Sequence, residues 1–194
     1  MTIAELLKQV GITKFNKPIK WAEPCPCEKQ GVYIISFCAD PNIEMKKPAK
    51  PQFDNKAIQT WIDFLPEFQL NKQRPTVEKV KQELQRFWLP KENILYIGNT
   101  TRPLRDRIDE EYNTQLGKGG PHSGGQWLKT LANINKLYIH YIPTESIEIK
   151  PILLEHFRNT IGELPFANLT IQAPKPENIN SYKKNHGFSK QRKK

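Results

Sequence analysis

Several side chains that can bind anions, metal ions or protons stand close to turns in this sequence. Two tyrosines lie beside glycines, in Gly31-Val32-Tyr33 and in Tyr96-Ile97-Gly98. Further along, Arg107 ends a Leu-x-x-Arg pattern, Glu155 ends a Leu-Leu-Glu pattern, and Asn168 ends Pro-Phe-Ala-Asn. Guanidinium groups form charge-assisted hydrogen bonds with phosphate, and a carboxylate is a ligand for hard divalent cations. These residue types together could bind an anionic ester and a metal ion.

Three runs rich in β-branched and aromatic residues predict the strands that carry the tyrosines. They cover 31–37, 94–97 and 137–142, and turn residues bound them. Helical patterns separate the runs, so we expect the α/β class, of the α+β type. The sheet would be small, three-stranded, and mixed or antiparallel, with helices flanking it.

Apolar residues at three- and four-residue steps predict the helices. The first is a short amphipathic helix near the N-terminus, with Ile3, Leu6, Leu7 and Val10 on one side. The others are expected at 55–65, 74–89, 104–113, 126–133 and 151–161.

The chain has 194 residues, a length that favours one domain. We expect this domain over 1–170, with 38–92 as a helical insertion between the first two strands. The segment 171–194 reads as a basic, flexible tail, because it holds seven basic residues and one acidic residue.

The formal net charge of +10 makes a polyanion a plausible partner, and nucleic acid is the leading candidate. No apolar run approaches the roughly 20 residues of a membrane helix. The N-terminus lacks the features of a signal peptide. Three cysteines, an odd number, argue against a disulfide-stapled secreted scaffold. We therefore expect a cytoplasmic protein without a membrane partner.

Taken in order, these motifs resemble the GIY-YIG nuclease superfamily. The matching pieces are GVY at 31–33, YIG at 96–98, LRDR at 104–107, Glu155 in LLEHF, and Asn168 in PFAN. The resemblance covers about 31–169, apart from the segment between the first two strands. It implies a GIY-YIG-like fold and a phosphodiester hydrolase, that is, an endonuclease.

The sequence departs from the usual family pattern at four places. Family members join the two tyrosine strands by a short connection, whereas 37–92 intervenes here. Asn99 follows YIG where the family often has Lys. Arg105 is a rival for the role of Arg107, because the preceding turn is one residue longer. Glu111 stands where the family often has a His or Tyr helper, so the helper could be Glu111, the adjacent Tyr112, or His122.

The resemblance implies a different role for each of the catalytic residues. Glu155 would be the metal ligand for Mg²⁺, with Mn²⁺ as a substitute. The metal ion would supply charge and assist the leaving group. Arg107 would clamp the scissile phosphate. The alternative for Arg107 is a surface ion pair with a nearby acidic residue, Asp109, Glu110 or Glu111. Tyr33 would act as the base or hold the nucleophilic water, and Tyr96 would lie beside it.

Further residues are candidates for contact with the substrate. His122 lies in a glycine-rich loop at 117–125, where it could grip a phosphate or shuttle a proton, or be an ordinary loop histidine. Asn168 could orient Glu155 or the helix that carries it, or be a turn residue. The predicted substrate-binding residues are Asn168, Arg105, Lys118, Lys183 and Lys184.

The sequence thus predicts a magnesium-dependent DNA endonuclease, of restriction type or related to phages and mobile elements. A duplex cut on both strands needs two active centres, a need that a homodimer would meet. The first alternative is a non-catalytic nucleic-acid-binding module on the same fold. The second is an interaction domain whose tyrosines belong to the core. No Walker A loop, HExxH or GxSxG motif is present, so those chemistries are not expected.

Overall fold

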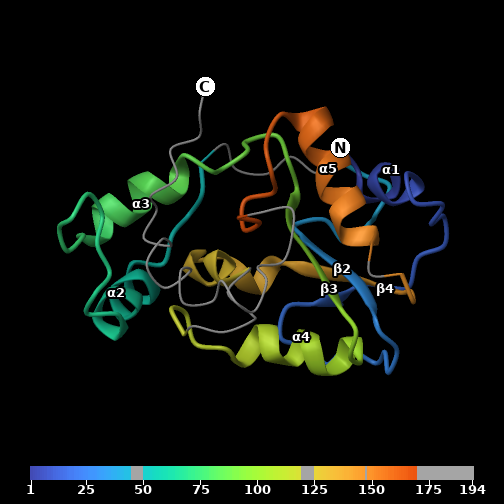
Figure 1. The fold of residues 1–194 in the computed structure, drawn as a ribbon, viewed down its shortest axis with the longest axis horizontal. Coiled ribbons are helices and arrows are strands. Elements are labelled where there is room, and N and C mark those ends of the chain that lie inside the picture. The colour runs from blue at the N-terminus through green and yellow to red at the C-terminus, as the bar shows by residue number, and fades with distance from the viewer. Residues whose placement is uncertain (45–49, 119–124, 147, 170–194) are drawn as a thin grey trace.

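A four-stranded antiparallel sheet forms the centre of the fold. The structure is a computed structural model and describes residues 1–44, 50–118, 125–146 and 148–169. The strands lie in the order β1 (Ile19–Lys20), β4 (Tyr138–Pro143), β2 (Gly31–Ser36) and β3 (Ile94–Thr100) (Figure 1). With its helices, the chain belongs to the α+β class.

The central strand β2 is buried over its whole length and fixes the register of its neighbours. Tyr33 lies opposite Gly98 of β3 on one side and opposite Tyr141 of β4 on the other. Successive side chains of a strand point to opposite faces of a sheet, so a strand covered on both faces is apolar throughout. This explains why 31–37 is a continuous apolar and aromatic run rather than an alternating one.

Different helices cover the two faces of the sheet. On one face α1 (Ile3–Lys8) and α5 (Ile149–Ile161) pack against Val32, Ile34 and Ile97. On the other face, α4 (Leu104–Asn113) packs with Leu104 and Ile108 in the cluster that contains Tyr33 and Tyr96. Figure 1 shows α4 on one side of the sheet and α1 with α5 on the other.

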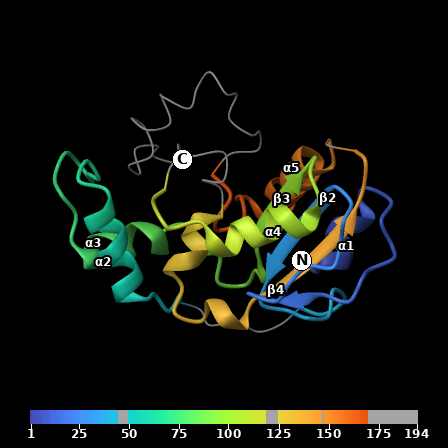
Figure 2. The ribbon, with the colours of Figure 1, turned by 90° about the horizontal axis from the view of Figure 1, so that it is seen from below.

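The insertion between β2 and β3 forms two helices, α2 (Asn55–Phe64) and α3 (Val77–Gln85). Both views place this pair at one end of the molecule, away from the sheet (Figures 1 and 2). A bridge between Phe53 and Leu131 connects the insertion to the segment that precedes β4. The α2 residue Trp61 stacks on Phe68 at 4.7 Å between ring centroids, so the insertion adds to the main core rather than standing apart.

The expected strands and helices are present, and the sheet has one strand more than predicted. The additional strand β1 has two residues, too few for any periodicity to show. Helix α3 is shorter than 74–89 because the Thr76 side chain caps its N-terminus and the turns after Arg86 close on the third residue back. The helix expected at 126–133 is a 3₁₀ helix over Gln126–Thr130. It ends there because Ala132 donates its backbone N–H to Gln52 instead.

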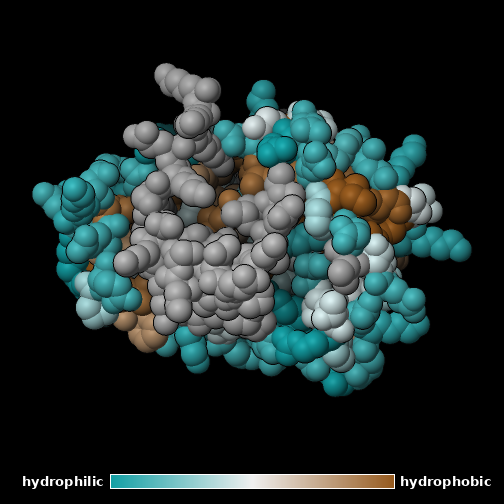
Figure 3. All heavy atoms as spheres, in the orientation of Figure 1, coloured by the Kyte–Doolittle hydropathy of each residue, from teal (hydrophilic) through white to brown (hydrophobic). Residues whose placement is uncertain are grey.

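The described surface on the face of Figure 3 is mostly hydrophilic, and apolar residues show as separate patches. The large apolar side chains that are most exposed are Ile43, Phe64 and Ile152, each on a different segment. Among the described residues, no helix combines the length and apolarity needed to cross a membrane.

Helix α5 allows a direct test of this two-sided packing. Phe157 is fully buried against the sheet, whereas Ile152 on the same helix is 47% exposed. We expect Phe157→Ala to lower the free energy of unfolding by about 3–5 kcal/mol, through the lost contacts and the cavity left behind. Ile152→Ala should change it by less than about 1 kcal/mol. Urea denaturation of both variants measures the difference, and equal losses would contradict the assigned orientation of α5.

Candidate active site

Two tyrosines, an arginine and a glutamate meet between the sheet and α4. Tyr33 comes from β2, Tyr96 from β3, and Arg107 and Glu111 from successive turns of α4. We call these four residues the polar cluster. All four are buried, with no more than 7% of any of them exposed. Buried polar groups must find partners among themselves, so the arrangement of this cluster is tightly constrained.

The glycine of the YIG motif makes room for the phenol of Tyr33. A Cβ atom added at Gly98 would lie 2.2 Å from Cζ and 2.5 Å from the hydroxyl oxygen of Tyr33. Gly98 is the register partner of Tyr33, so the phenol extends over a position that has no side chain. The ring of Tyr96 lies 5.9 Å from that of Tyr33, centroid to centroid, in a tilted arrangement. The close approach of Tyr33 therefore explains the glycine that follows Tyr96-Ile97.

Arg107 and Glu111 form an ion pair along one face of α4. Their spacing of four residues places them on adjacent turns, and Nη2 of Arg107 lies 2.7 Å from Oε2 of Glu111. The hydroxyl of Tyr33 donates a hydrogen bond of 3.0 Å to the same carboxylate oxygen. The guanidinium also lies over the ring of Tyr33, at 5.6 Å from its centroid. Glu111 therefore connects the strand tyrosine with the helix arginine.

One guanidinium nitrogen of Arg107 has no hydrogen-bond partner within the described part of the chain. This atom, Nη1, is fully buried. A buried donor without a partner is unfavourable by about 1–3 kcal/mol, and by more when it is charged. Such a group is suited to receive an anionic ligand, because a phosphate oxygen would satisfy it.

Glycine also brings the 3₁₀ segment close to Glu111. Gly125, which precedes Gln126–Thr130, has a φ of 89°, and a Cβ atom there would lie 2.4 Å from Oε1 of Glu111. Any other residue would therefore be strained in its backbone and would collide with the carboxylate. The backbone at Gly125 thus packs close to the carboxylate of Glu111 and to the ring of Tyr96.

Burial decides the protonation states in the polar cluster. It raises the pKa of Tyr33 well above its usual value, and the nearby Glu111 carboxylate raises it further. Burial likewise raises the pKa of Tyr96 to about 12. Burial alone would lower the pKa of Arg107, but its anionic neighbours hold that pKa above the usual value. At neutral pH both phenols are therefore protonated and Arg107 is charged.

The carboxyl of Glu111 is affected by opposing influences. Burial raises its pKa, and the positive charge of Arg107 and the hydrogen bond from Tyr33 offset part of that rise. Two lysines stand within electrostatic range of this carboxylate, namely Lys129 after Gly125 and Lys150 in the first turn of α5. Burial lowers the pKa of each. The surroundings of Glu111 therefore carry an excess of positive charge.

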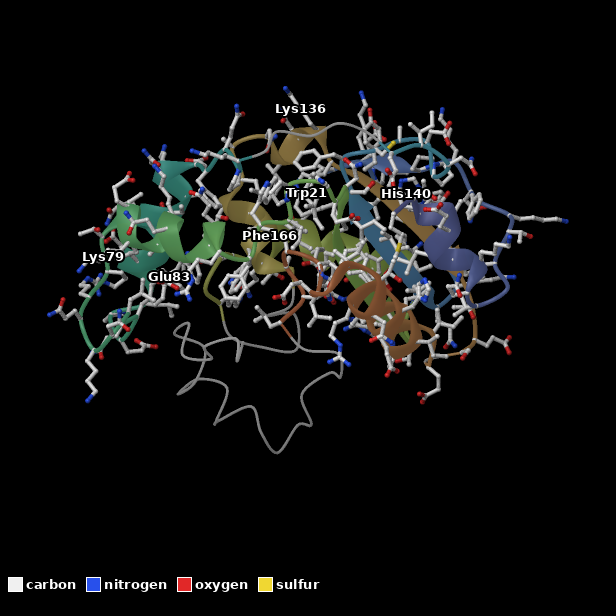
Figure 4. The ribbon with its side chains drawn as sticks, turned by 90° about the horizontal axis from the view of Figure 1, so that it is seen from above. Trp21, Lys79, Glu83, Lys136, His140 and Phe166 are labelled. Atoms are coloured by element: carbon white, nitrogen blue, oxygen red, sulfur yellow. The ribbon has the colours of Figure 1, made fainter. Side chains whose placement is uncertain are left out.

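Asn168 uses its side-chain amide to hold β3. Its Oδ1 accepts a hydrogen bond from the backbone N–H of Ile97, and its Nδ2 donates one to the carbonyl of Ile97, both at 2.9 Å. The ring of Phe166, which Figure 4 labels, anchors the same segment. Its centroid lies 5.3 Å from that of Trp88 and 6.0 Å from that of Trp127. Asn168 thus fixes the strand that carries Tyr96, and its amide is occupied by the backbone.

Glu155 does not join the polar cluster in the structure. It lies on the exposed side of α5, and the buried stripe of that helix packs on the other face of the sheet. Within the described residues, no three His, Cys, Asp or Glu side chains come together as metal ligands would. The described residues therefore offer Mg²⁺ one exposed carboxylate, that of Glu155, and the structure does not bring this carboxylate to Tyr33, Tyr96 or Arg107.

The other predicted site residues are divided between the surface and the segments that are not described. Arg105 is exposed and pairs with Glu28 and Asp106, so Arg107 rather than Arg105 faces the tyrosines. Lys118 is exposed. His122, Lys183 and Lys184 lie outside the described residues. Tyr112, the rival of Glu111, turns away and donates its hydroxyl hydrogen to the carbonyl of Glu23.

Sequence reasoning left Lys129 and Lys150 without a role near the polar cluster, and it left Glu111 as one of several candidates for the helper position. The spacing of four residues between Arg107 and Glu111, on the helix face that also carries Leu104 and Ile108, is a signal that could have pointed to Glu111. The positions of Lys129 and Lys150 depend on how η1 and α5 pack, and no local pattern indicates that.

Comparisons with protein-family models, with curated proteins and with solved structures give no significant match. The likeness to GIY-YIG nucleases therefore depends on the residues and motifs of this chain alone.

The contact between Gly98 and Tyr33 yields a prediction on stability. Gly98→Ala forces the phenol to move, and we expect it to lower the free energy of unfolding by about 1–3 kcal/mol. In a Tyr33→Ala background the same change should be nearly neutral, because the ring that it strikes is absent. A double-mutant cycle measured by urea denaturation gives the coupling between the two positions. Additive losses would contradict the close approach.

The raised pKa of Glu111 predicts how stability depends on pH. The folded state binds the Glu111 proton more tightly than the unfolded state, so this carboxyl favours folding most at pH values below its unfolded pKa. Its contribution falls as the pH rises from the unfolded-state pKa through the folded-state pKa of Glu111. The total fall is about 1.4 kcal/mol for each pH unit that separates these two pKa values. We expect the stability of the native chain, relative to Glu111→Gln, to decrease over that range. Urea titrations at a series of pH values test this, and a difference that rises with pH would contradict it.

Proposed function

We propose that this chain is a magnesium-dependent DNA endonuclease with a GIY-YIG-like core, of restriction type or related to phages and mobile elements. The observation that supports this most directly is the meeting of Tyr33, Tyr96 and Arg107 on one face of the sheet. These three residues come from three separate motifs of the resemblance, and the fold brings them together.

Arg107 is suited to hold a scissile phosphate and keep Glu111 at the same time. Its Nη2 is engaged by Glu111, and its Nη1 has no partner among the described residues. A guanidinium can bind two anions through different nitrogens, and it stabilises the charge that grows on the phosphate oxygens during hydrolysis. Lys129 and Lys150 add positive potential nearby.

Tyr33 and Tyr96 would hold and orient the attacking water through their protonated hydroxyls. Glu155 would hold Mg²⁺, which supplies charge neutralisation and assistance to the leaving group when it is bound. The net charge of +10 favours DNA as the substrate through release of its counterions.

Burial of the polar cluster favours a second candidate function, a nucleic-acid-binding module without chemistry. Arg107 is neutralised by Glu111, and Glu155 is exposed on a helix that packs on the other face of the sheet. In such a module the four side chains would be a polar core that fixes α4 on the sheet, and the surface charges would bind the phosphate backbone.

Cleavage of supercoiled plasmid distinguishes the two candidates. We expect nicked or linear DNA with Mg²⁺ and none with a chelator. Arg107→Ala should cut on the order of 100-fold or more slowly, because a main transition-state donor is lost. Glu155→Gln should lose Mg²⁺-dependent cutting and keep DNA binding. Arg86→Ala, an exposed arginine of the insertion that pairs with Glu83, is the matched control and should cut normally.

Three results would decide against the endonuclease. Salt-sensitive binding without nicks in Mg²⁺ or Mn²⁺ would establish the binding module. Cleavage that survives Arg107→Ala unchanged would exclude the proposed site. Absence of DNA binding near about 100 mM salt would contradict both candidates and favour a protein-interaction domain.

A further inference from the structure

At neutral pH the Tyr33 hydroxyl is already protonated, so it cannot simply take a proton from water. Burial and the neighbouring Glu111 carboxylate keep the phenol protonated. A protonated phenol can accept a proton only if it gives up its own at the same time. The structure shows where that proton would go, because the Tyr33 hydroxyl donates to Oε2 of Glu111 at 3.0 Å.

We propose that Glu111 receives the proton of the attacking water through Tyr33, so that the two residues act together as the general base. This inference rests on the endonuclease function proposed above. Glu111 acts through Tyr33 and touches no substrate, so it is a positioning residue that also holds the proton. The geometry that supports this role is a single carboxylate oxygen shared by the phenol and by Arg107.

The step balances without any further reactant. An O–H bond of water breaks, its proton moves to Oη of Tyr33, and the Tyr33 proton moves to Oε2 of Glu111. The hydroxide oxygen forms a bond to phosphorus while the bond from phosphorus to the leaving sugar oxygen breaks. The leaving oxygen takes a proton from solvent. Glu111 returns its proton through Tyr33 after the product leaves, so the chain ends unchanged.

The charged and titratable groups around Glu111 are three cations and three phenols, the third phenol being Tyr112, which donates its hydroxyl hydrogen to the carbonyl of Glu23. Arg107 on α4, Lys129 beyond Gly125 and Lys150 on α5 are cations that keep the carboxylate ionised before the step. Tyr33 and Tyr96 are neutral phenols from the sheet. Burial makes the carboxylate a better proton acceptor than an exposed glutamate. The backbone at Gly125 lies close to its other oxygen.

The pH dependence of plasmid cleavage tests this transfer of a proton from water through Tyr33 to Glu111, which we call the relay. With saturating Mg²⁺, kcat/KM of the native chain should rise with pH and level off above the pKa of Glu111. Glu111→Gln keeps an acceptor for the Tyr33 hydroxyl but takes up no proton, and Tyr33→Phe removes the relay. We expect both to cut roughly 10²- to 10⁴-fold more slowly and to lose this rise. Glu110→Gln, the neighbouring acid that pairs with Arg102, is the control and should retain the rate and the rise.

The possible results distinguish failure of the relay from failure of the endonuclease function on which it rests. A native chain that does not cut DNA overturns the endonuclease and the relay together. A native chain that cuts, with a Glu111→Gln variant that is slower at every pH by one constant factor, overturns the relay alone and makes Glu111 purely structural. If Glu111→Gln does not fold by circular dichroism, Glu111→Asp decides. If kcat/KM of Glu111→Asp rises with pH over a different pH range from that of the native chain, the relay is supported. If the two pH profiles of kcat/KM are identical, the relay is overturned.

Discussion

A buried ion pair between Arg107 and Glu111 determines how α4 can sit on the sheet. Neither charge can reach bulk water, so each depends on the other and on the hydroxyl of Tyr33. Removing one member of such a pair typically costs about 3–5 kcal/mol, because the other charge stays buried alone. Two glycines, Gly98 and Gly125, allow this contact by leaving space where side chains would otherwise stand. The ion pair thus connects the helix with the strand, and the two glycines allow the sheet and the 3₁₀ segment to pack closely around it.

The same pair makes the chemistry of the polar cluster asymmetric. One nitrogen of Arg107 is engaged in structure and another is left over. One carboxylate oxygen of Glu111 is shared by two donors, and the backbone at Gly125 crowds the other. In the phosphate-binding role proposed above, a phosphate oxygen would satisfy this remaining donor.

Much of the fold could be predicted from local patterns, because strand and helix periodicities are set by which faces are buried. The runs at 31–37 and 137–142, and the helix after Pro103, are clear for this reason. The two-residue strand β1 could not be predicted, since its pairing with β4 is decided by tertiary contacts. Likewise the segment after Gly125 carries helical spacing, but Ala132 is drawn into a bond with the insertion.

The candidate site was predictable to the extent that motifs named Tyr33, Tyr96 and Arg107. The sequence offered Asp109, Glu110 and Glu111 as partners of Arg107 in a surface ion pair. Only the packing of α4 shows that the partner is Glu111 and that the pair is buried. For Glu155 the sequence motif indicated the residue but not its surroundings. Which side of α5 faces solvent depends on how that helix packs on the sheet.

The way in which residues 166–168 cover β3 has a consequence for assembly. A free outer strand invites pairing with the same strand of another molecule. Here the Ala167 amide and the Asn168 side chain occupy the carbonyl of Leu95 and both backbone groups of Ile97. At the other border β1 offers only two residues, directly after Pro18. Two molecules that associate would therefore do so through helices or loops, rather than by continuing one sheet into the next.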